Sequence, residues 1–436
     1  MKKARILWLI LTMLIAGNAL IAQDSIYSFH YQLTCIEQGH GRYRALYSGT
    51  NSLNPNPERA LSLTTTLFVG RKLWKYGSLY FNPEIMGGNG MSKSRGIAGF
   101  PNGETFRIDN SDPRVYVARL FYRQYIPFRN TGYDTVQSEF NQIKEIVPAS
   151  RLQFTFGKFS IVDFFDKSII SHDPRVDFMN WSLMSNAGWD YPANTRGYTE
   201  GFVVEMIKPM HALRFSICKV PTWANGPDLD PHILKANSFT LEGEQKYKMF
   251  NQNGTFRLLF TYTRSKAPKI SDVVNNYISG VDTSLDIINS NKYGGKKYGY
   301  AASWEHSFTP NLTMLIRNSW NDGRYATWAF TEVDASSSVL FRKYKIFTDD
   351  DNFGLAFVKN DLSADHIRFY QLGGYGFMIG DGKLNYSPEM IMETFYKINY
   401  NRYMSLTFDY QYVINPAYNK DRGPVSVYAM RVHIEI

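Results

Sequence analysis

The last strand-like segment of the sequence alternates strictly between two sets of side chains, and this pattern constrains the fold more than any other. The apolar set is Tyr428, Met430, Val432, Ile434 and Ile436, and the other set is Ala429, Arg431, His433 and Glu435. Alternate side chains of a strand point to opposite faces of a sheet. A membrane barrel needs such strands, because its outer face meets lipid and its inner face meets water. The segment therefore predicts a strand of a membrane barrel.

The same period of two recurs along the whole chain. It is clearest in residues 27–35 and 404–414, and further candidates are 61–69, 79–85, 115–125, 202–206, 256–262, 298–308, 312–320 and 390–398. A tilted strand needs about ten residues to cross a bilayer. Counting the candidates predicts one all-β, antiparallel transmembrane barrel of roughly 16 strands.

The segments between these strands alternate in length. Tight turns are predicted at 208–211, 309–311 and 399–402, and long loops at 86–113, 127–150, 163–196 and 267–297. Single-chain barrels of outer membranes have short periplasmic turns and longer extracellular loops. We therefore expect short periplasmic turns and long loops that lie outside the cell or fold inward. One helix is predicted in a loop, where Ser363 would cap its first turn.

Composition supports a barrel over a bundle of membrane helices. Aromatic residues make up 16% of the chain and hydrophobic residues 44%, and the mean hydropathy is −0.32. A helical membrane protein would be far more apolar. Beyond the N-terminus no stretch approaches the about 20 apolar residues of a spanning helix.

The N-terminus has the pattern of a secretory signal peptide. Three basic residues stand within the first five positions, and residues 6–16 form an apolar run of 11. Such a run is too short to span a bilayer. We expect cleavage after Ala22, although Ala19 also fits, which divides the chain into a signal peptide, 1–22, and a barrel, 23–436. The alternative is a membrane anchor.

The chain carries a mild positive charge and offers no obvious cofactor site. After removal of the signal, 45 basic and 39 acidic residues would remain, a net charge of +6. No block of basic residues predicts a nucleic-acid partner, but the excess could favour anionic or polar solutes. Cys35 and Cys218 are expected on opposite barrel faces as free, buried thiols. No His and Cys spacing predicts a metal site, and no cofactor is expected.

Four stretches resemble the carbohydrate-selective porins of the OprB type. They are Gln38-Gly39-His40 with 47–49 and 51–53, then 96–104, then 157–159 with 163–166, and last 380–386 with 388–389, 410–411, 415–416 and 421–424. The resemblance implies a 16-stranded barrel of the bacterial outer membrane, surrounded by lipid, through which small carbohydrates such as monosaccharides diffuse. The loops 127–150 and 267–297 depart from the family pattern.

A sugar pore needs side chains that replace water around hydroxyl groups without binding tightly. In the strand predicted at 115–125, Arg119 and Arg123 share one face with Val115 and Val117. Four residues along a strand span about 13 Å. We expect the two guanidinium groups to form part of a basic ladder up the lumen. The alternative is that they pair with loop carboxylates and only brace the barrel.

Two carboxylates are candidates for solute contact. Glu84 lies on the inward phase of its strand together with Asn82, and Glu104 follows the turn-rich stretch 99–103 in a long loop. Carboxylates accept hydrogen bonds from sugar hydroxyls. Glu104 and the nearby Phe100 could reach a constriction, or the loop could serve only as a structural plug.

The loop 163–196 holds the best candidates for stacking on a sugar ring. Trp189 and Tyr191 lie near Asp173 and Arg196, with Trp181 nearby. Aromatic faces cover the apolar faces of a pyranose ring. The alternative is that these rings form an aromatic girdle or the core of the loop. On the barrel wall, the phases of Asp409 and Arg431 predict a cross-strand ion pair in the lumen.

Other functions stay open at this point. The pore could pass organic acids or other anions, or the barrel could be the scaffold of an outer-membrane enzyme or adhesin. No GxSxG, HExxH or Walker-type motif occurs in the sequence, so we expect no enzyme. Many porins are trimers, and we keep a homotrimer as one alternative for the assembly of this chain.

Overall fold

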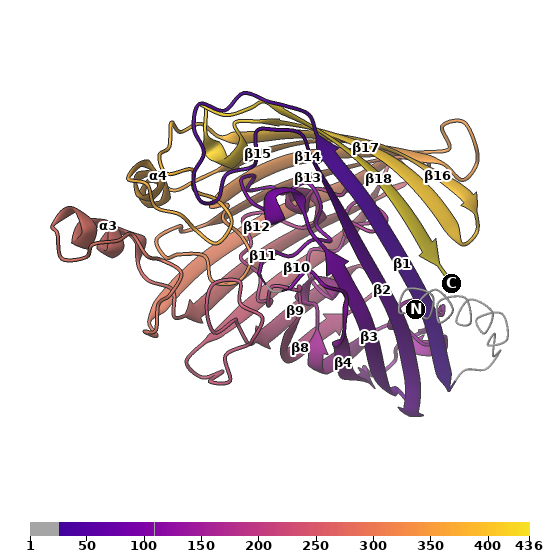
Figure 1. Ribbon diagram of the computed structural model, residues 1–436. Helices are drawn as coiled ribbons and strands as arrows, with labels where there is room; N and C mark the ends of the chain where they lie inside the picture. The colour runs from indigo at the N-terminus through magenta and orange to yellow at the C-terminus, as the bar shows by residue number, and fades with distance from the viewer. Residues whose placement is uncertain (1–25, 109) are drawn as a thin grey trace, which may run out of the picture.

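In the described residues, sixteen antiparallel strands close into one barrel. Figure 1 shows how these strands are arranged. The computed structural model describes residues 26–108 and 110–436. The signal segment 1–22 lies outside the described residues. Consecutive barrel strands are neighbours, and the first strand pairs with the last, from Gln32 opposite Glu435 to His40 opposite Val427. The predicted number of strands is confirmed.

The element bounds are as follows. The barrel strands are β1 (Tyr27–His40), β2 (Glu58–Trp74), β3 (Gly77–Gly88), β4 (Arg114–Pro127), β7 (Arg151–Phe159), β8 (Thr199–Ile207), β9 (His211–Cys218), β10 (Asn237–Met249), β11 (Gln252–Ser265), β12 (Gly295–Thr309), β13 (Leu312–Asn321), β14 (Ala335–Tyr344), β15 (Asn352–Asp361), β16 (Glu389–Asn401), β17 (Met404–Ile414) and β18 (Val425–Glu435). A separate hairpin is formed by β5 (Tyr133–Val136) and β6 (Glu145–Pro148). The helices are α2 (Trp181–Met184), α3 (Ile270–Ile278) and α4 (Ala364–Gln371), with short 3-10 turns η2 (Met91–Lys93), η3 (Ile161–Asp163) and η4 (Pro416–Tyr418).

Burial follows the predicted alternation. In β18, Arg431 and His433 are buried inside the barrel, whereas Tyr428 and Met430 are exposed on its outer face. The pattern holds because the barrel encloses polar side chains and leaves apolar ones for lipid. Cys35, in the outward set of β1, is half-buried and free, and Cys218 is buried and free.

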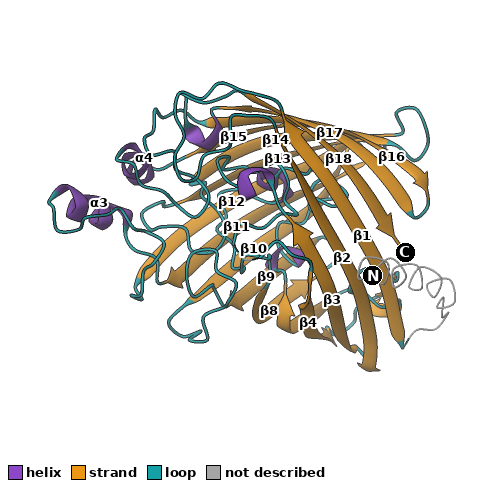
Figure 2. Ribbon diagram, in the orientation of Figure 1, coloured by secondary structure: helices purple, strands orange, loops and turns teal. Residues whose placement is uncertain are grey.

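The two ends of the barrel differ, as Figure 2 shows by the crowding of teal loops at one end. The helices α3 and α4 lie at this loop end, and the C-terminus lies at the opposite, turn end (Figure 1). The Ser363 side chain accepts a hydrogen bond from the backbone N–H of His366, which confirms the predicted cap of α4. None of the helices in the described ranges is long and apolar enough to cross a membrane.

The segment 128–150 is the exception to this asymmetry. It joins β4 to β7 at the turn end, although its length predicted a place among the long loops of the other side. It folds against the inner wall, where Phe140 stacks on the inward ring of Phe68 at 4.3 Å, and the Ser138 hydroxyl bonds the ring of His30 at 2.9 Å. The prediction from length placed this segment at the wrong end of the barrel, because a long connection at the turn end can also fold back into the barrel.

A β-bulge corrects the predicted face of the arginine ladder. Asn82 pairs with Arg119, but the next residue, Pro83, pairs with Val117, so Ala118 is an extra residue in β4. Val115 and Val117 therefore point outward, with 72% and 37% of their surface exposed, while Arg119 points inward with 7% exposed. An extra residue reverses the faces of a strand on either side of it. The two arginines are inward, but they do not share a face with the two valines.

Candidate pore constriction

The long loop between β7 and β8, residues 160–198, lies inside the barrel and is fixed to the wall by charged side chains. The Glu393 carboxylate on β16 accepts a hydrogen bond from the backbone N–H of Met179 at 2.6 Å. Arg431 on β18 donates to the carbonyl oxygen of Pro174 at 2.7 Å. Buried backbone groups of a loop need such partners. We call this segment the inward loop.

The predicted cross-strand pair of Asp409 and Arg431 does not form. Arg431 stands opposite Thr407, and its guanidinium donates to the Thr407 hydroxyl at 3.0 Å and to carbonyl groups of the inward loop. Asp409 instead accepts a hydrogen bond from the side chain of Gln411 at 3.0 Å. Both side chains point inward as predicted, but they do not pair with each other. The inward loop supplies the acceptors for Arg431, and the alternation of a strand gives no information about such loop contacts.

The inward loop, the wall and the loop 89–113 enclose a cavity of about 120 Å³. Five residues of the predicted set line it, namely Glu104, Arg119, Asp173, Tyr191 and Arg196. Its ionisable lining also includes Asp163, His172 and Arg175. Three guanidinium groups thus face three carboxylates, so the cavity combines strong donors and acceptors with little net charge.

Arg119 and Asp163 form a two-pronged ion pair on one side of the cavity. Nε and Nη2 of Arg119 donate to the two carboxylate oxygens of Asp163 at 2.6 and 2.7 Å. Burial by itself would raise the pKa of Asp163, but the Arg119 guanidinium outweighs it, and the pKa is lowered below its ordinary value. The pair therefore stays charged, and it links the wall to the start of the inward loop.

Arg175 is the central cation of the cavity, and sequence reasoning missed it. Its guanidinium lies 2.8 Å from Glu104, 3.6 Å from Glu84 and 3.6 Å from Asp173. Burial raises the pKa of Glu104, and Arg175 only partly offsets this. The sequence pattern 173–175 showed a charged turn in a long loop, and no periodicity there indicates where the side chain points.

Glu84 stands behind the cavity, on the inward face of β3. The hydroxyl of Tyr198 donates to its carboxylate at 2.8 Å, and the hydroxyls of Tyr116 and Thr66 donate as well. Its inward phase is as predicted. Both oxygens of the Glu84 carboxylate accept hydrogen bonds from protein side chains. Glu84 therefore contacts the cavity only through its ion pair with Arg175.

Arg196 also lines the cavity. Its guanidinium stacks over the ring of Phe106, 4.5 Å from the centroid, and over that of Tyr116 at 4.7 Å.

The aromatic candidates divide into two groups. Trp189 is buried, with 1% of its surface exposed, and packs edge-on against Phe165. Tyr191 stacks on Phe330 at 4.9 Å and also lines the cavity. Phe330 in turn stacks on Trp181 at 5.7 Å. Trp189 thus belongs to the core of the inward loop, and Tyr191 stands at the border of core and cavity.

Arg123 lies away from the cavity, towards the turn end. Its guanidinium donates to the carbonyl oxygen of Asn141 at 3.0 Å and stacks over Tyr80 at 5.1 Å. It therefore holds the segment 128–150 against the wall, but through a backbone carbonyl oxygen and not through a loop carboxylate, as the alternative for the arginine ladder expected.

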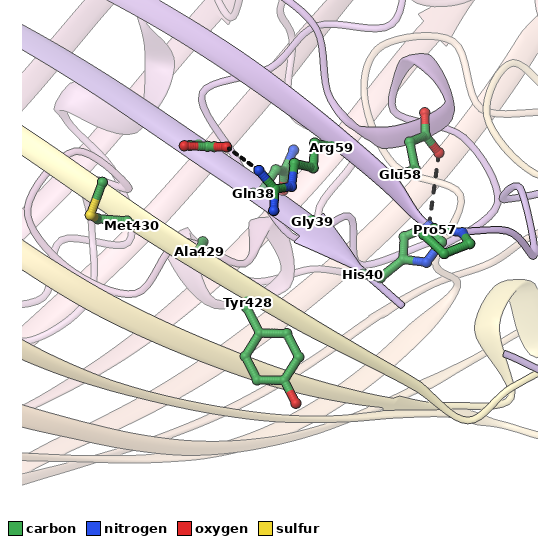
Figure 3. Close-up of a pocket in the computed structure, with 10 residues that line it drawn as sticks. Gln38, Gly39, His40, Pro57, Glu58, Arg59, Tyr428, Ala429 and Met430 are labelled. Atoms are coloured by element: carbon green, nitrogen blue, oxygen red, sulfur yellow. Dashed lines mark ion pairs between the residues drawn. The ribbon is translucent and has the colours of Figure 1, made fainter. Parts of the chain in front are cut away.

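A second hollow, of about 580 Å³, lies on the outer wall where the first and last strands meet. Figure 3 shows Tyr428 and Met430 on one side of it and Arg59 on the other. Arg59 lies 3.8 Å from the carboxylate of Glu37, and both side chains are exposed. Gly39 also lines it. These outward residues place the hollow outside the lumen, so it is no part of a solute route.

In the described ranges, no three His, Cys, Asp or Glu side chains gather in a way that could hold a metal ion.

Comparison with known proteins agrees with the barrel. The family model described as carbohydrate-selective porin, OprB family, matches residues 60–436. A solved structure of OprB from Pseudomonas putida is similar, with a TM-score of 0.68, 14% identity and 94% of each chain covered. The outer membrane channel DcaP of Acinetobacter baumannii has a TM-score of 0.51 at 10% identity, over 94% of this chain and 97% of that one. At these identities the structural likeness shows the fold alone. No curated protein matches the sequence.

Proposed function

Because the chain belongs to the OprB family of carbohydrate-selective porins, and is thus a carbohydrate porin of the bacterial outer membrane, we propose that its solutes pass the cavity between the inward loop and β4. The finer part of the proposal is that small carbohydrates, monosaccharides in size, diffuse passively and contact Arg119, Arg175 and Glu104. The observation that carries this proposal is that Arg119, Arg175 and Glu104 all line one cavity, where each of them forms an ion pair.

The chemistry of the cavity suits a polar, uncharged solute. A sugar hydroxyl both donates and accepts, so it can bond a carboxylate and a guanidinium at once. Since the charges of Arg175 and Glu104 are already paired, neither holds a solute strongly, and a passing molecule can leave as readily as it enters. Tyr191 and Phe106 add apolar surface for the faces of the ring.

The family and the barrel indicate a channel rather than an enzyme. The proposal accordingly includes no bound cofactor and no energy source, and the concentration gradient drives uptake. The surrounding partner is the lipid of the outer membrane, in keeping with the apolar outer face of the strands.

Uptake by reconstituted vesicles tests the proposed route. Swelling of vesicles in glucose measures passive entry, and Arg119→Gln and Arg175→Gln should each change the rate several-fold. Arg402→Gln is the matched control, because it removes the same charge from an exposed residue in the turn between β16 and β17. A wild-type protein that admits no glucose would refute the carbohydrate route, and equal rates in all variants would refute the cavity.

We also propose a homotrimer as the assembly. The support is the outward Glu37–Arg59 pair beside the hollow at Gly39, since a charged pair on an outer face fits a contact with a second copy. Mass measurement in detergent tests it, with Arg59→Glu as the variant: a trimer that this change dissociates supports the contact. A wild-type monomer, or a trimer that persists unchanged in the variant, refutes it.

A further inference from the structure

Residues 167–169 form the face of the inward loop that points to the turn end of the barrel. The backbone N–H of Ile169 donates to the carboxylate of Glu305 at 3.1 Å, and Glu305 lies near the end of β12 that reaches the turns. The hydroxyl of Tyr344, the last residue of β14, donates to the carbonyl oxygen of Ile169 at 3.5 Å. The cavity extends the other way, to Tyr198 beside the loop-end start of β8. A solute that leaves the cavity towards the turn end therefore passes this face.

Lys167 is exposed on this face, although the loop is enclosed by the barrel. The preceding residue, Asp166, is buried and pairs with Arg317 on β13 at 3.3 Å. The backbone N–H of Asp166 donates to the carboxylate of Glu242 on β10 at 2.6 Å. The backbone next to Lys167 is thus fixed to the wall, while the side chain of Lys167 projects into the water of the lumen.

The ammonium group of Lys167 has no ion-pair or hydrogen-bond partner among residues 26–108 and 110–436. The other charges of the inward loop near it are matched: Arg175 pairs with Glu104, and Asp163 and Asp166 pair with arginines of the wall. The charged neighbours of Lys167 come from β4, β8, β9 and the inward loop itself, and the structure describes all of these elements completely. Lys167 therefore adds a positive charge that has no direct partner in the described chain.

The two carboxylates that act most strongly on Lys167 each have an arginine partner. The surrounding protein removes water from the ammonium group, which lowers its pKa, and Glu205 on β8 acts in the opposite direction. Glu205 pairs with Arg214 at 3.1 Å. Asp163 is the second carboxylate, and it pairs with Arg119 at 2.6 Å. Since both negative charges are matched, the local excess of charge is positive.

The charge of Lys167 also reaches the cavity. His172 lines the cavity, and burial, and then the charge of Lys167, lower the pKa of His172. Salt water screens charges over about 10 Å. Lys167 therefore lies close to the point where a solute leaves the cavity.

On the basis of the proposed function, we propose that Lys167 is a specificity-determining residue of the pore. Its ammonium group contacts the carboxylate of an acidic sugar that leaves the cavity, so the porin passes sugar acids more readily than neutral sugars of the same size. In the cavity, cations and anions are paired and favour neither sign of charge. An unpaired ammonium group is a point charge with three donors, and in a narrow passage it concentrates anions.

The test compares glucose with glucuronate, which has similar size and carries a carboxylate. Vesicle uptake of both is measured for the wild type, for Lys167→Gln and for Lys208→Gln. Lys208 is the matched control, because it is an exposed lysine in the turn between β8 and β9, outside the lumen. We expect glucuronate uptake to fall about fivefold in Lys167→Gln only, the size of effect that one unit charge has at about 4 Å in water. Glucose uptake should stay within about twofold in all three proteins.

Two further measurements support the same residue. Lys167→Arg keeps the charge and should restore glucuronate uptake, whereas Lys167→Glu reverses it and should lower this uptake below that of Lys167→Gln. In 1 M salt, where the screening length is about 3 Å, the differences between the variants should largely vanish.

The outcomes separate the two proposals. Wild-type protein that admits neither sugar refutes the proposed function itself. Wild-type protein that admits glucose, with equal glucuronate rates in all variants, leaves the function standing and overturns the role of Lys167. An equal loss in Lys208→Gln assigns the effect to the overall charge of the protein, and a loss of both sugars in Lys167→Gln assigns it to the shape of the loop. Either result also overturns the role of Lys167.

Discussion

The carboxylate of Glu389, at the start of β16, accepts a hydrogen bond from the backbone N–H of Gly99 at 2.7 Å. Its other oxygen accepts from Ala98 at 3.0 Å and from Ala417 at 2.8 Å. One buried wall carboxylate thus fixes two loops that are distant in sequence. Glu393 lies four residues further along β16, and its carboxylate accepts hydrogen bonds from two backbone N–H groups of the inward loop. The loops are therefore held as parts of the barrel interior.

We expect Glu389→Ala to loosen both loops and lower stability. Each buried N–H left without an acceptor costs about 1–3 kcal/mol. Glu389→Gln keeps one acceptor oxygen and should lose less. Thermal unfolding in detergent, followed by circular dichroism, measures the change, with Glu139→Gln at an exposed residue of the segment 128–150 as the control. An alanine variant that unfolds at the temperature of the control would contradict the anchoring role.

Removal of the central cation should change both stability and ion selectivity. Arg175→Gln leaves Glu84 and Glu104 without their shared cation, and breaking a buried pair in this way costs about 3–5 kcal/mol. The reversal potential in a salt gradient should shift towards cations. The double variant R175Q/E104Q restores the balance of charge and should recover part of both effects. A double variant as perturbed as the single one would show that the pair does not act as a unit.

Acid should weaken the inward loop through His172, which lines the cavity. Burial, and then the charge of Lys167, lower the pKa of His172 below its ordinary value of 6.5. The unfolded chain therefore takes up a proton at a higher pH than the folded one, so stability is complete above about pH 6.5 and decreases as pH falls towards the folded pKa. The paired Asp163 acts in a lower window, since its pKa is lowered below 3.8.

The measurement is the unfolding temperature at pH 7, 6 and 5. We expect it to fall over this range, and to fall less steeply in His172→Asn, which cannot take up the proton. Equal slopes in the two proteins would exclude His172 as the responsible group.

The bulge at Ala118 should be necessary for assembly. Deletion of Ala118 would force either the outward Val115 and Val117 inward or Arg119 and Arg123 outward. An arginine on the lipid face costs about 2–4 kcal/mol near the middle of the bilayer. We expect the deletion to reduce folding into vesicles strongly, as read from heat-modifiable electrophoretic mobility. Ala118→Gly, which keeps the chain length, is the control, and efficient folding of the deletion variant would contradict the prediction.

Much of the cavity lining could be predicted from the sequence, but the hydrogen-bond and ion-pair partners of its side chains could not. The inward phase of Glu84 and Arg119 and the loop position of Glu104 led to the cavity, because a strand face or a long loop restricts where a side chain can be. Arg175 was missed, and Trp189 turned out to lie in the loop core. Both residues lie in a loop, where the sequence has no periodicity that indicates the direction of a side chain.

The sequence by itself determined the barrel: the period of two in segments such as 404–414 is a local property of extended backbone, and it persists whatever the rest of the chain does. Only the tertiary structure decided that Ala118 reverses a face, that the segment 128–150 folds inward at the turn end, and that Arg175 meets Glu104. Those features depend on contacts between residues tens of positions apart, and the energy of such contacts is set by packing inside the closed barrel.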